Sequence, residues 1–356
     1  MKRNFSIFNF QFSILLVVAF AACTPDNPKP QPTPETVKAQ TPRKIATANG
    51  KLYVTCYRPA SVIRIDTATL KVDAICKLGN YNPEGIAVAG GKLFVVSSWN
   101  TAENGDYLYD DKVYVIDTAS FTVTSTVTVG FNPQQVKVID DGHVIVNYSG
   151  NYADIPSGTA IINANTLEVT QTGQEMTAMS VSGGKVYGYS VVYDESWNPT
   201  ASFVCLDMAT MTTSPLLEGS SIGDPYGLNV IGDAIYVTTH SDYVANGDVV
   251  CFAMDGTQRW RSEAGMLPSK VEPTGDGNAI VLNEGNWSGN NSSLSKVNLA
   301  TGAIGNNVFS AANGRGLGDV AQDVVVYGTK AYVTVSFSNT IEAMSLDDCS
   351  SVQISL

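Results

Sequence analysis

Basic residues are scarce in this sequence. Its 356 residues include 21 Lys and Arg against 33 Asp and Glu, which gives a formal net charge of −12 at pH 7. Binding of nucleic acid or of an anionic membrane surface depends on Lys and Arg that neutralise phosphate groups. The composition therefore argues against nucleic acid as a partner. We expect any contact with a membrane to be made through a lipid anchor.

Side chains that carry out chemistry are few as well. The chain has two histidines and no pair of cysteines at C-x-x-C spacing, and it contains no Gly-rich phosphate loop. We expect His143 in an exposed turn, and the sequence gives no sign of a Ser or Cys nucleophile that the His240 ring would activate. The acidic pairs at 110–111 and 347–348 lack the spacing of a calcium loop and are expected in solvated turns. These absences predict a protein that is not an enzyme and that needs no cofactor or metal.

Long apolar segments are also missing. The apolar run at residues 14–22 is too short to span a bilayer, and no segment has the periodicity of an amphipathic helix. Lys2 and Arg3 precede this run, and the stretch Phe-Ala-Ala-Cys at residues 20–23 resembles a bacterial lipobox. Residues 1–22 are therefore predicted to be a signal peptide, and Cys23 is predicted to carry lipid.

A proline-rich segment follows Cys23. Five prolines fall within residues 25–34, and such a segment is a stiff, extended spacer without core-forming residues. An ordinary signal peptide followed by an incidental cysteine is the alternative, but a spacer makes sense where a folded body stands off a membrane. Residues 23–40 are therefore interpreted as a lipidated tether, with the protein on the outer membrane and facing the cell surface.

A unit of about 45 residues recurs seven times between residues 41 and 356. It consists of an apolar strand that usually begins at Pro, a Gly turn, a strand such as Leu-Tyr-Val-Thr, a variable loop, a strand ending in Asp or Asn, and a last strand. This pattern predicts an all-β fold, a seven-bladed β-propeller with four-stranded antiparallel blades, whereas a pair of β-sandwiches would not repeat the same turns seven times. The copies begin at or near Pro42, Pro83, Pro133, Met176, Pro225, Pro268 and Val320.

Each predicted blade is contiguous in the sequence, so the ring is expected to close by packing of the first blade against the last. Cys23 apart, the cysteines number five, which cannot all be paired within the chain, and buried free thiols in strands are expected. Cys205 and Cys251 occupy equivalent positions in two repeats. These cysteines are Cys56, Cys76, Cys205, Cys251 and Cys349.

The two faces of such a ring differ in this sequence. Turns between the first and second strands are short and rich in Gly, as at 49–50, 90–91 and 183–184, and are typical of structural hairpins. Loops between the second and third strands are long and aromatic, and they emerge on the same face as the links between blades. The loop candidates for ligand binding are Tyr57, Arg58, Trp99, Asn100, Tyr148, Tyr152, Tyr193, Trp197, His240, Tyr243, Asn286, Trp287 and Phe337. The links add Arg43, Glu84, Gln134, Tyr226, Lys270 and Gln322 near the central channel.

Aromatic side chains mixed with Asn and Gln are typical of a recognition surface held on a rigid scaffold. Some of these rings are expected only to pack one loop against another. Because the asymmetry between the faces has no folding rationale, the sequence favours binding on the loop face.

The repeats Pro-Glu-Gly-Ile-Ala-Val at 83–88, Lys-Leu-Phe-Val-Val at 92–96 and Val-Tyr-Val-Ile-Asp-Thr at 113–118 resemble the YncE/YVTN-like propeller family. Two further stretches, Asn-Glu-Gly-Asn-Trp at 283–287 and Asn-Gly-Arg-Gly-Leu-Gly-Asp-Val-Ala-Gln-Asp at 313–323, resemble propeller lipoproteins of Bacteroidetes, among them the BtuG-type surface cobalamin-binding family. In that family the first of these stretches lies near the N-terminus, so its place in the sixth repeat implies a permuted order of blades.

The resemblance implies a surface lipoprotein that captures a cobalamin-type corrinoid and works with a TonB-dependent outer-membrane transporter. A corrinoid is large, rigid and rimmed with amides, which suits aromatic rings and Asn or Gln side chains. Glycans or peptides would use the same loops, and a protein-interaction scaffold without a small ligand is the other open interpretation.

Overall fold

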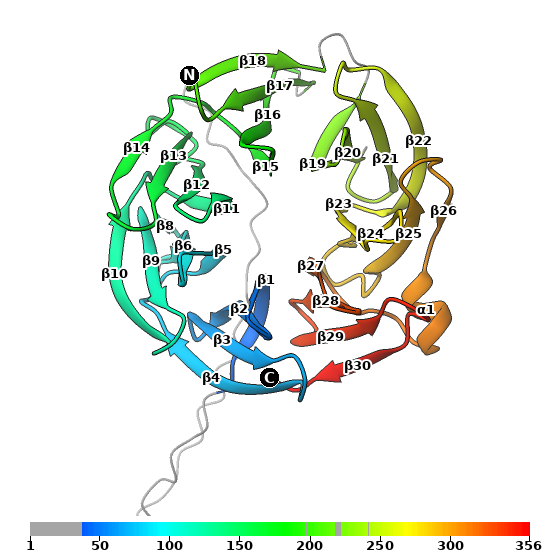
Figure 1. The fold of residues 1–356 in the computed structure, drawn as a ribbon, viewed down its shortest axis with the longest axis horizontal. Coiled ribbons are helices and arrows are strands. Elements are labelled where there is room, and N and C mark those ends of the chain that lie inside the picture. Colours follow the sequence, from blue (N-terminus) through cyan, green and yellow to red (C-terminus); the bar gives the residue numbers. More distant parts are fainter. Residues whose placement is uncertain (1–37, 197, 218–221, 241) are drawn as a thin grey trace, which may run out of the picture. The chain divides into compact units, whose positions relative to one another are not determined.

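The computed structural model describes residues 38–356 except 197, 218–221 and 241. The predicted signal peptide, Cys23, most of the predicted tether and Trp197 lie outside the described residues. Within them, seven four-stranded antiparallel sheets stand in a ring, so the predicted seven-bladed β-propeller is confirmed (Figure 1).

The innermost strand of each blade faces the centre of the ring (Figure 1). Proline is tolerated near the start of these strands because one of their edges has no neighbouring strand and needs no ladder hydrogen bond there. A register irregularity follows the first paired residues in six of the seven, which re-aims the next side chains. The inner strands are β1 (Gln40–Ala48), β5 (Pro83–Ala89), β11 (Pro133–Asp140), β15 (Ala178–Ser182), β19 (Asp224–Ile231), β23 (Pro268–Pro273) and β27 (Ala321–Tyr327).

Backbone N–H groups on the open edge of these strands still need acceptors. Polar side chains of the preceding blade supply them at five of the junctions between neighbouring inner strands. Gln135 Oε1 accepts from Met179 N at 3.2 Å, Ser180 Oγ from Val230 N at 2.9 Å, Asn229 Oδ1 from Val271 N at 2.9 Å, Glu272 Oε1 from Val326 N at 3.1 Å and Asp323 Oδ2 from Ile45 N at 2.9 Å.

The second and third strands form the buried middle of each blade. They are rich in Val and Ile, whose branched side chains fit a sheet that is covered on both sides. These strands are β2 (Lys51–Arg58), β3 (Ser61–Asp66), β6 (Lys92–Ser97), β9 (Lys112–Asp117), β12 (His143–Tyr148), β13 (Gly158–Asn163), β16 (Lys185–Tyr193), β17 (Pro199–Asp207), β20 (Ala234–His240), β21 (Asn246–Ala253), β24 (Asn278–Asn283), β25 (Ser293–Asn298), β28 (Lys330–Val335) and β29 (Thr340–Ser345).

The outermost strands form the rim, and most of their side chains are exposed or half-buried, as in strands with one wet face. They are β4 (Lys71–Lys77), β10 (Thr122–Thr128), β14 (Val169–Gln171), β18 (Thr212–Leu216), β22 (Gln258–Met266), β26 (Ile304–Gly305) and β30 (Ser351–Ile354).

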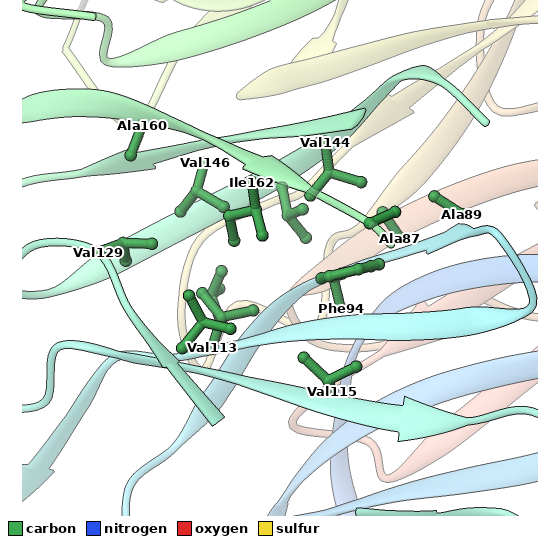
Figure 2. Packing of buried hydrophobic residues seen from close by; sticks show 14 residues of the cluster. Ala87, Ala89, Phe94, Val113, Val115, Val129, Val144, Val146, Ala160 and Ile162 are labelled. Carbon is green, nitrogen blue, oxygen red and sulfur yellow. The ribbon is translucent and has the colours of Figure 1, made fainter. Parts of the chain in front are cut away.

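The core is divided into seven apolar clusters, one at each junction between neighbouring blades. Figure 2 shows the cluster between the second and third blades, where Phe94 and Val115 of one sheet face Val144 and Ile162 of the next. Removing these side chains from water is the main term that holds each pair of blades together.

The ring closes without exchange of a strand, as predicted. Blade 1 consists only of β1–β4 and blade 7 only of β27–β30, and one apolar cluster joins them. Hydrogen bonds reinforce this junction: Thr334 Oγ1 donates to Arg43 O at 2.6 Å, and Tyr327 accepts from Gly50 N at 2.9 Å.

Three features differ from the sequence-based expectations. A six-residue helix, α1 (Val308–Asn313), precedes blade 7, and it is too short to produce a periodic signal. A small hairpin, β7 (Trp99–Thr101) with β8 (Tyr107–Tyr109), occupies the loop of blade 2. The prediction of a solvated turn is wrong for Asp110, which is buried because Ser97 Oγ donates to it at 2.6 Å and Asp111 N at 2.9 Å.

Other local expectations are confirmed. His143 directly follows the turn at 141–142 as the first residue of β12, and its side chain is 44% exposed beside Asp140. The pair at 347–348 is exposed. The five cysteines are free. Cys205 and Cys251 lie in the third strands of their blades, and each pairs with a tyrosine of the second strand. Cys349 differs from the expectation, because it is half-buried in a turn rather than buried in a strand. Within the described residues, none of the helical structure has the length and apolar character that crossing a bilayer requires.

Candidate ligand-binding face

Exposed aromatic side chains lie on one face of the ring. Seven aromatic residues in the described part of the chain are between 39% and 55% exposed, and all belong to loops between second and third strands or to a link between blades. This face, called the loop face below, is the one that the sequence predicted to be aromatic. The seven residues are Tyr107, Phe131, Tyr152, Tyr193, Tyr243, Trp287 and Phe337.

An unbroken path of rings crosses the loops of blades 1, 2 and 3. The ring centroids are 6.1 Å apart for Tyr57 and Trp99, 5.5 Å for Trp99 and Tyr107, 6.4 Å for Tyr107 and Tyr109, and 6.2 Å for Tyr109 and Tyr152. Trp99 pairs with Tyr109 across the β7–β8 hairpin, and Tyr107 lies two residues before Tyr109, so the three side chains share one face of the hairpin. These five rings are called the aromatic path.

A buried ion pair supports the first ring of the path. Arg43 Nη2 lies 3.2 Å from Glu84 Oε2, and the Arg43 guanidinium is 4.8 Å from the centre of the Tyr57 ring. The Tyr57 hydroxyl donates to Glu84 Oε1. Because the two charges neutralise each other below the ring, the surface above them is aromatic and nearly neutral.

Amides lie beside the middle of the path. Gln134 Nε2 donates to Ser98 Oγ at 2.8 Å and to Asn132 Oδ1 at 2.5 Å, and Asn132 Nδ2 donates to the Tyr152 hydroxyl at 3.4 Å. Asn100 Oδ1 accepts from the next backbone N–H at 2.8 Å. This side of the loop face therefore offers hydrogen-bonding groups together with aromatic surface.

A second, more deeply buried cluster joins blades 5, 6 and 7. The Tyr226 hydroxyl donates to Glu284 Oε2 at 2.9 Å, and Gln322 Nε2 reaches the same oxygen at 3.4 Å. Burial, with the nearby Glu284 carboxylate as a second cause, raises the pKa of Tyr226 well above its usual value. Tyr226 therefore stays protonated and serves as a donor that links adjacent blades.

His240 lies inside the same region. Its ring is 5.3 Å from that of Tyr226 and 4.1 Å from that of Tyr243, and its Nε2 is 3.5 Å from Asp224 Oδ2. Burial lowers the pKa of His240, and the charge of Asp224 acts in the opposite direction. Its Nδ1 is buried and has no hydrogen-bond partner among the described groups. His240 therefore supports the exposed ring of Tyr243 rather than facing solvent.

The loops of blades 6 and 7 contribute another aromatic pair. Trp287 and Phe337 lie 6.2 Å apart in an edge-to-face arrangement, and Asp319 Oδ2 accepts from Ser288 N at 3.1 Å. Asn286 N donates to Asn291 Oδ1 at 3.0 Å, which shapes the tight loop that presents Trp287.

The predicted residues fall into separate groups. Arg43, Tyr57, Glu84, Trp99 and Tyr152 belong to the aromatic path or its support. Tyr226, His240, Tyr243 and Gln322 form the second region, Tyr193 is exposed at its margin, and Trp287 pairs with Phe337 beside Asn286. Arg58 is exposed at the end of β2, at the edge of the loop face. Lys270 lies on the lining of the central channel.

Tyr148 packs against the cluster between blades 2 and 3, and its hydroxyl donates to Gln171 Oε1 at 2.7 Å. Sequence reasoning missed Asp224, Asn132 and Ser98. Each lies next to an inner strand or at the end of a second strand, so the repeat pattern itself was a signal that could have identified them.

The face is suited to binding through ring surfaces and hydrogen bonds. Among the described residues, no group of three or more His, Cys, Asp and Glu is arranged to hold a metal ion. The polar groups at the path are mostly neutral amides and hydroxyls, which can orient a ligand without a charged partner.

No protein-family model and no curated protein sequence matches this chain. Among solved structures, the chain is similar to hydrazine synthase of Kuenenia stuttgartiensis, with a TM-score of 0.65, 14% identity, and coverage of 90% of this chain and 100% of that chain. It is also similar to the Cps50 (Swd1) β-propeller domain of Myceliophteria thermophila, with a TM-score of 0.58, 10% identity and coverage of 92% and 100%. A computationally designed protein, Ika8, gives a TM-score of 0.56 at 8% identity over 85% of this chain and 83% of its own.

At these identities the likeness concerns the fold alone. The resemblance to YncE/YVTN-like propellers and to cobalamin-binding lipoproteins stays a prediction. By its sheets and by its structural neighbours, the chain is a seven-bladed β-propeller.

Proposed function

We propose that this chain is a non-enzymatic surface lipoprotein that captures a cobalamin-type corrinoid on its loop face for a TonB-dependent transporter. The observation that carries the proposal is the gathering of every exposed aromatic side chain of the described residues on that face. Single exposed apolar residues are common on any protein, but a one-sided set of rings marks a binding surface.

The chemistry of the aromatic path supports a flat, largely neutral ligand. Exposed rings such as Tyr107 and Tyr152 offer large apolar contact area with few rotatable bonds, so ordering them costs little entropy. The half-buried amides of Asn100 and Gln134 match the amide rim of a corrinoid. A rigid ligand on a rigid ring also loses little conformational freedom on binding.

A protein-binding scaffold is the second candidate. Val192, Val244 and Leu108 are 66%, 59% and 43% exposed near the same loops, and aliphatic side chains beside aromatic ones are typical of protein interfaces. In this case the loop face would bind a protein partner without any small ligand.

Mixing the purified protein with cyanocobalamin, followed by desalting, tests the corrinoid. We expect red colour to co-elute with the protein and calorimetry to show one binding event. If no colour co-elutes and micromolar protein gives no heat, the corrinoid is excluded, and binding to glycans, peptides or the transporter becomes the next measurement. Turnover of glycans or lactones that depends on His240 would contradict the absence of enzymatic activity.

The membrane anchor has its own test. Cys23→Ala should release the protein from the membrane fraction into the soluble fraction, because the proposed attachment is the lipid on Cys23. Unchanged retention in the membrane would contradict the lipoprotein assignment and leave the binding face unaffected.

A further inference from the structure

The central channel contains a group of charged side chains that the loop face does not use. A cavity of about 400 Å³ is lined by the inner strands of all seven blades. Its charged lining residues are three lysines from blades 1, 3 and 6 and two carboxylates from blades 6 and 7. They are Lys44, Lys137, Lys270, Glu272 and Asp323.

Lys270 uses both carboxylates. Its Nζ lies 2.9 Å from Asp323 Oδ1 and 3.3 Å from Glu272 Oε2, and it donates to Val324 O at 2.6 Å. Burial acts to lower the pKa of Lys270, but Asp323 and Glu272 outweigh it and raise the pKa above the usual value. Asp323 Oδ2 also accepts from Ile45 N, so these carboxylates are engaged with Lys270 and the backbone.

The other two lysines have no carboxylate partner. Lys44 Nζ donates to the backbone oxygen of Gln322 at 2.5 Å. Lys137 makes no hydrogen bond or ion pair with any described residue. Burial, with repulsion by Lys270 as the next cause, lowers the pKa of Lys137 to about 8. Near neutral pH its ammonium is therefore mostly charged. Asp323 and Glu272 attract it, but both carboxylates are already paired with Lys270.

Three lysines against two carboxylates leave one net positive charge in the channel of a protein whose formal net charge is −12. Lys137 is half-buried on the channel lining. A charge that is partly removed from water and has no ion-pair partner is costly in free energy, and a bound ion of opposite sign lowers that cost. Gln135 lies on the same lining, and because its Oε1 accepts from Met179 N, its amide NH₂ is a further donor.

We propose that the channel binds one small oxyanion, inorganic phosphate or a short carboxylate, at the ammonium of Lys137 with Lys44 as a second donor. The single uncompensated charge matches one monoanion. The cavity has room for such an ion with several waters, since one water occupies about 30 Å³ in the liquid. The site is separate from the aromatic path and does not depend on the corrinoid.

Calorimetry of the purified protein with inorganic phosphate and with acetate tests the site, in a buffer without other oxyanions. We expect binding in the millimolar range or tighter, and at least tenfold weaker binding for Lys137→Met. The control is Lys185→Met, because Lys185 is a half-exposed lysine outside the channel that pairs with Asp207. Binding should also weaken above pH 8, because Lys137, whose ammonium shares the channel with Lys44, Lys270, Glu272 and Asp323, loses its proton.

Lys137→Met removes an uncompensated charge and keeps most of the apolar stem, so the variant should fold, which its melting curve checks. If it fails to fold, NMR of the wild-type protein with ¹³C-methylated lysines decides, because a bound anion raises the pKa of Lys137. Phosphate binding that is equal in both variants, no binding of either ion at millimolar concentration, or a Lys137 titration that phosphate leaves unchanged would overturn the proposal.

Discussion

The two faces of the ring are made by the same seven repeats, yet they differ in the residue types and backbone geometry of their connections. On the turn face, opposite the loop face, paired residues such as Asn49 and Gly50 or Gly90 and Gly91 have positive φ, as tight hairpins require. Third strands on that face end in Asp66 or Asp117, whose side chains accept backbone N–H groups of the following turn. Backbone geometry therefore restricts the sequence of the turn face.

The loop face is less uniform. Its loops range from the two residues after β2 to the hairpin β7–β8, and they combine aromatic rings with positive-φ residues such as Gly105 and Gly150 that differ from blade to blade. This difference indicates that folding depends on the turn face, whereas the loop face is available for recognition. The predictions below test this division, from the largest expected effect to the smallest.

The ion pair of Arg43 and Glu84 beside Tyr57 is an exception, because it lies on the loop face and is nevertheless expected to stabilise the fold. Arg43→Met leaves the buried Glu84 carboxylate without its cation. Because Arg43 is 18% exposed, we expect a loss of about 3 kcal/mol in the free energy of unfolding, the low end for a buried pair. Lys51→Met on the turn face, which breaks exposed pairs with Asp66 and Asp73, should change stability little. Urea denaturation measures both. Equal losses in the two variants would show that the loop-face pair has no special structural role.

The aromatic path should contribute to ligand binding but little to the stability of the fold. Trp99→Ala is expected to weaken cyanocobalamin binding by about 10- to 100-fold, as loss of a central aromatic anchor does. Because Trp99 is only half-buried, the midpoint of urea unfolding should move little. Met211→Ala, an exposed side chain on the turn face, is the matched control and should leave the affinity unchanged. Unaltered binding by the Trp99 variant would place the ligand elsewhere.

A turn-face glycine should show the opposite behaviour. Gly91 has φ +72° and open space around its Cα, so Gly91→Ala tests backbone strain alone. We expect a loss of about 1 kcal/mol in stability and no change in ligand affinity. Gly305 also has open space but no positive φ, and Gly305→Ala should be neutral or slightly stabilising. Similar stability of the two variants would contradict the role assigned to turn geometry.

His240 should make stability depend weakly on pH. Its folded-state pKa lies below its unfolded value of about 6.5, so the unfolded chain binds the proton more readily. The stability that the neutral His240 contributes is fully present above pH 6.5, and it is lost as the pH falls from there toward the folded-state pKa. His240→Gln should therefore lose less stability than wild type between pH 7.5 and pH 5.5. Parallel stability curves for the variant and the wild type would contradict a buried, neutral His240.

Much of the fold could be predicted because each repeat carries its own local signals. The Gly turns, the apolar strands and the Asp or Asn at strand ends occur within single blades, so their spacing alone defined seven units. Helix α1 was missed because six residues contain less than two turns of periodic pattern. Asp110 was misjudged because its burial depends on Ser97 and on the link that begins the next blade, not on its own neighbours in the loop.

The candidate site could be predicted only in outline. Alternation of strand direction placed the aromatic loops on one face, but which rings meet depends on loops from different blades. Likewise, Tyr148 and Tyr152 are four residues apart, yet one packs into a junction and the other stands exposed on the aromatic path.

The sequence by itself determined the number of blades, the contiguity of each blade and the face that carries the rings, because these follow from local periodicity and turn chemistry. Only the tertiary structure decided that Arg43 pairs with Glu84, that Tyr226 meets Glu284 58 residues away, and that Lys137 faces the channel without a partner. The physical reason is that closing the ring brings seven separate strands and seven separate loops around one axis. The charge balance of the channel and the contacts between aromatic rings arise only in the closed propeller, and no single repeat encodes them.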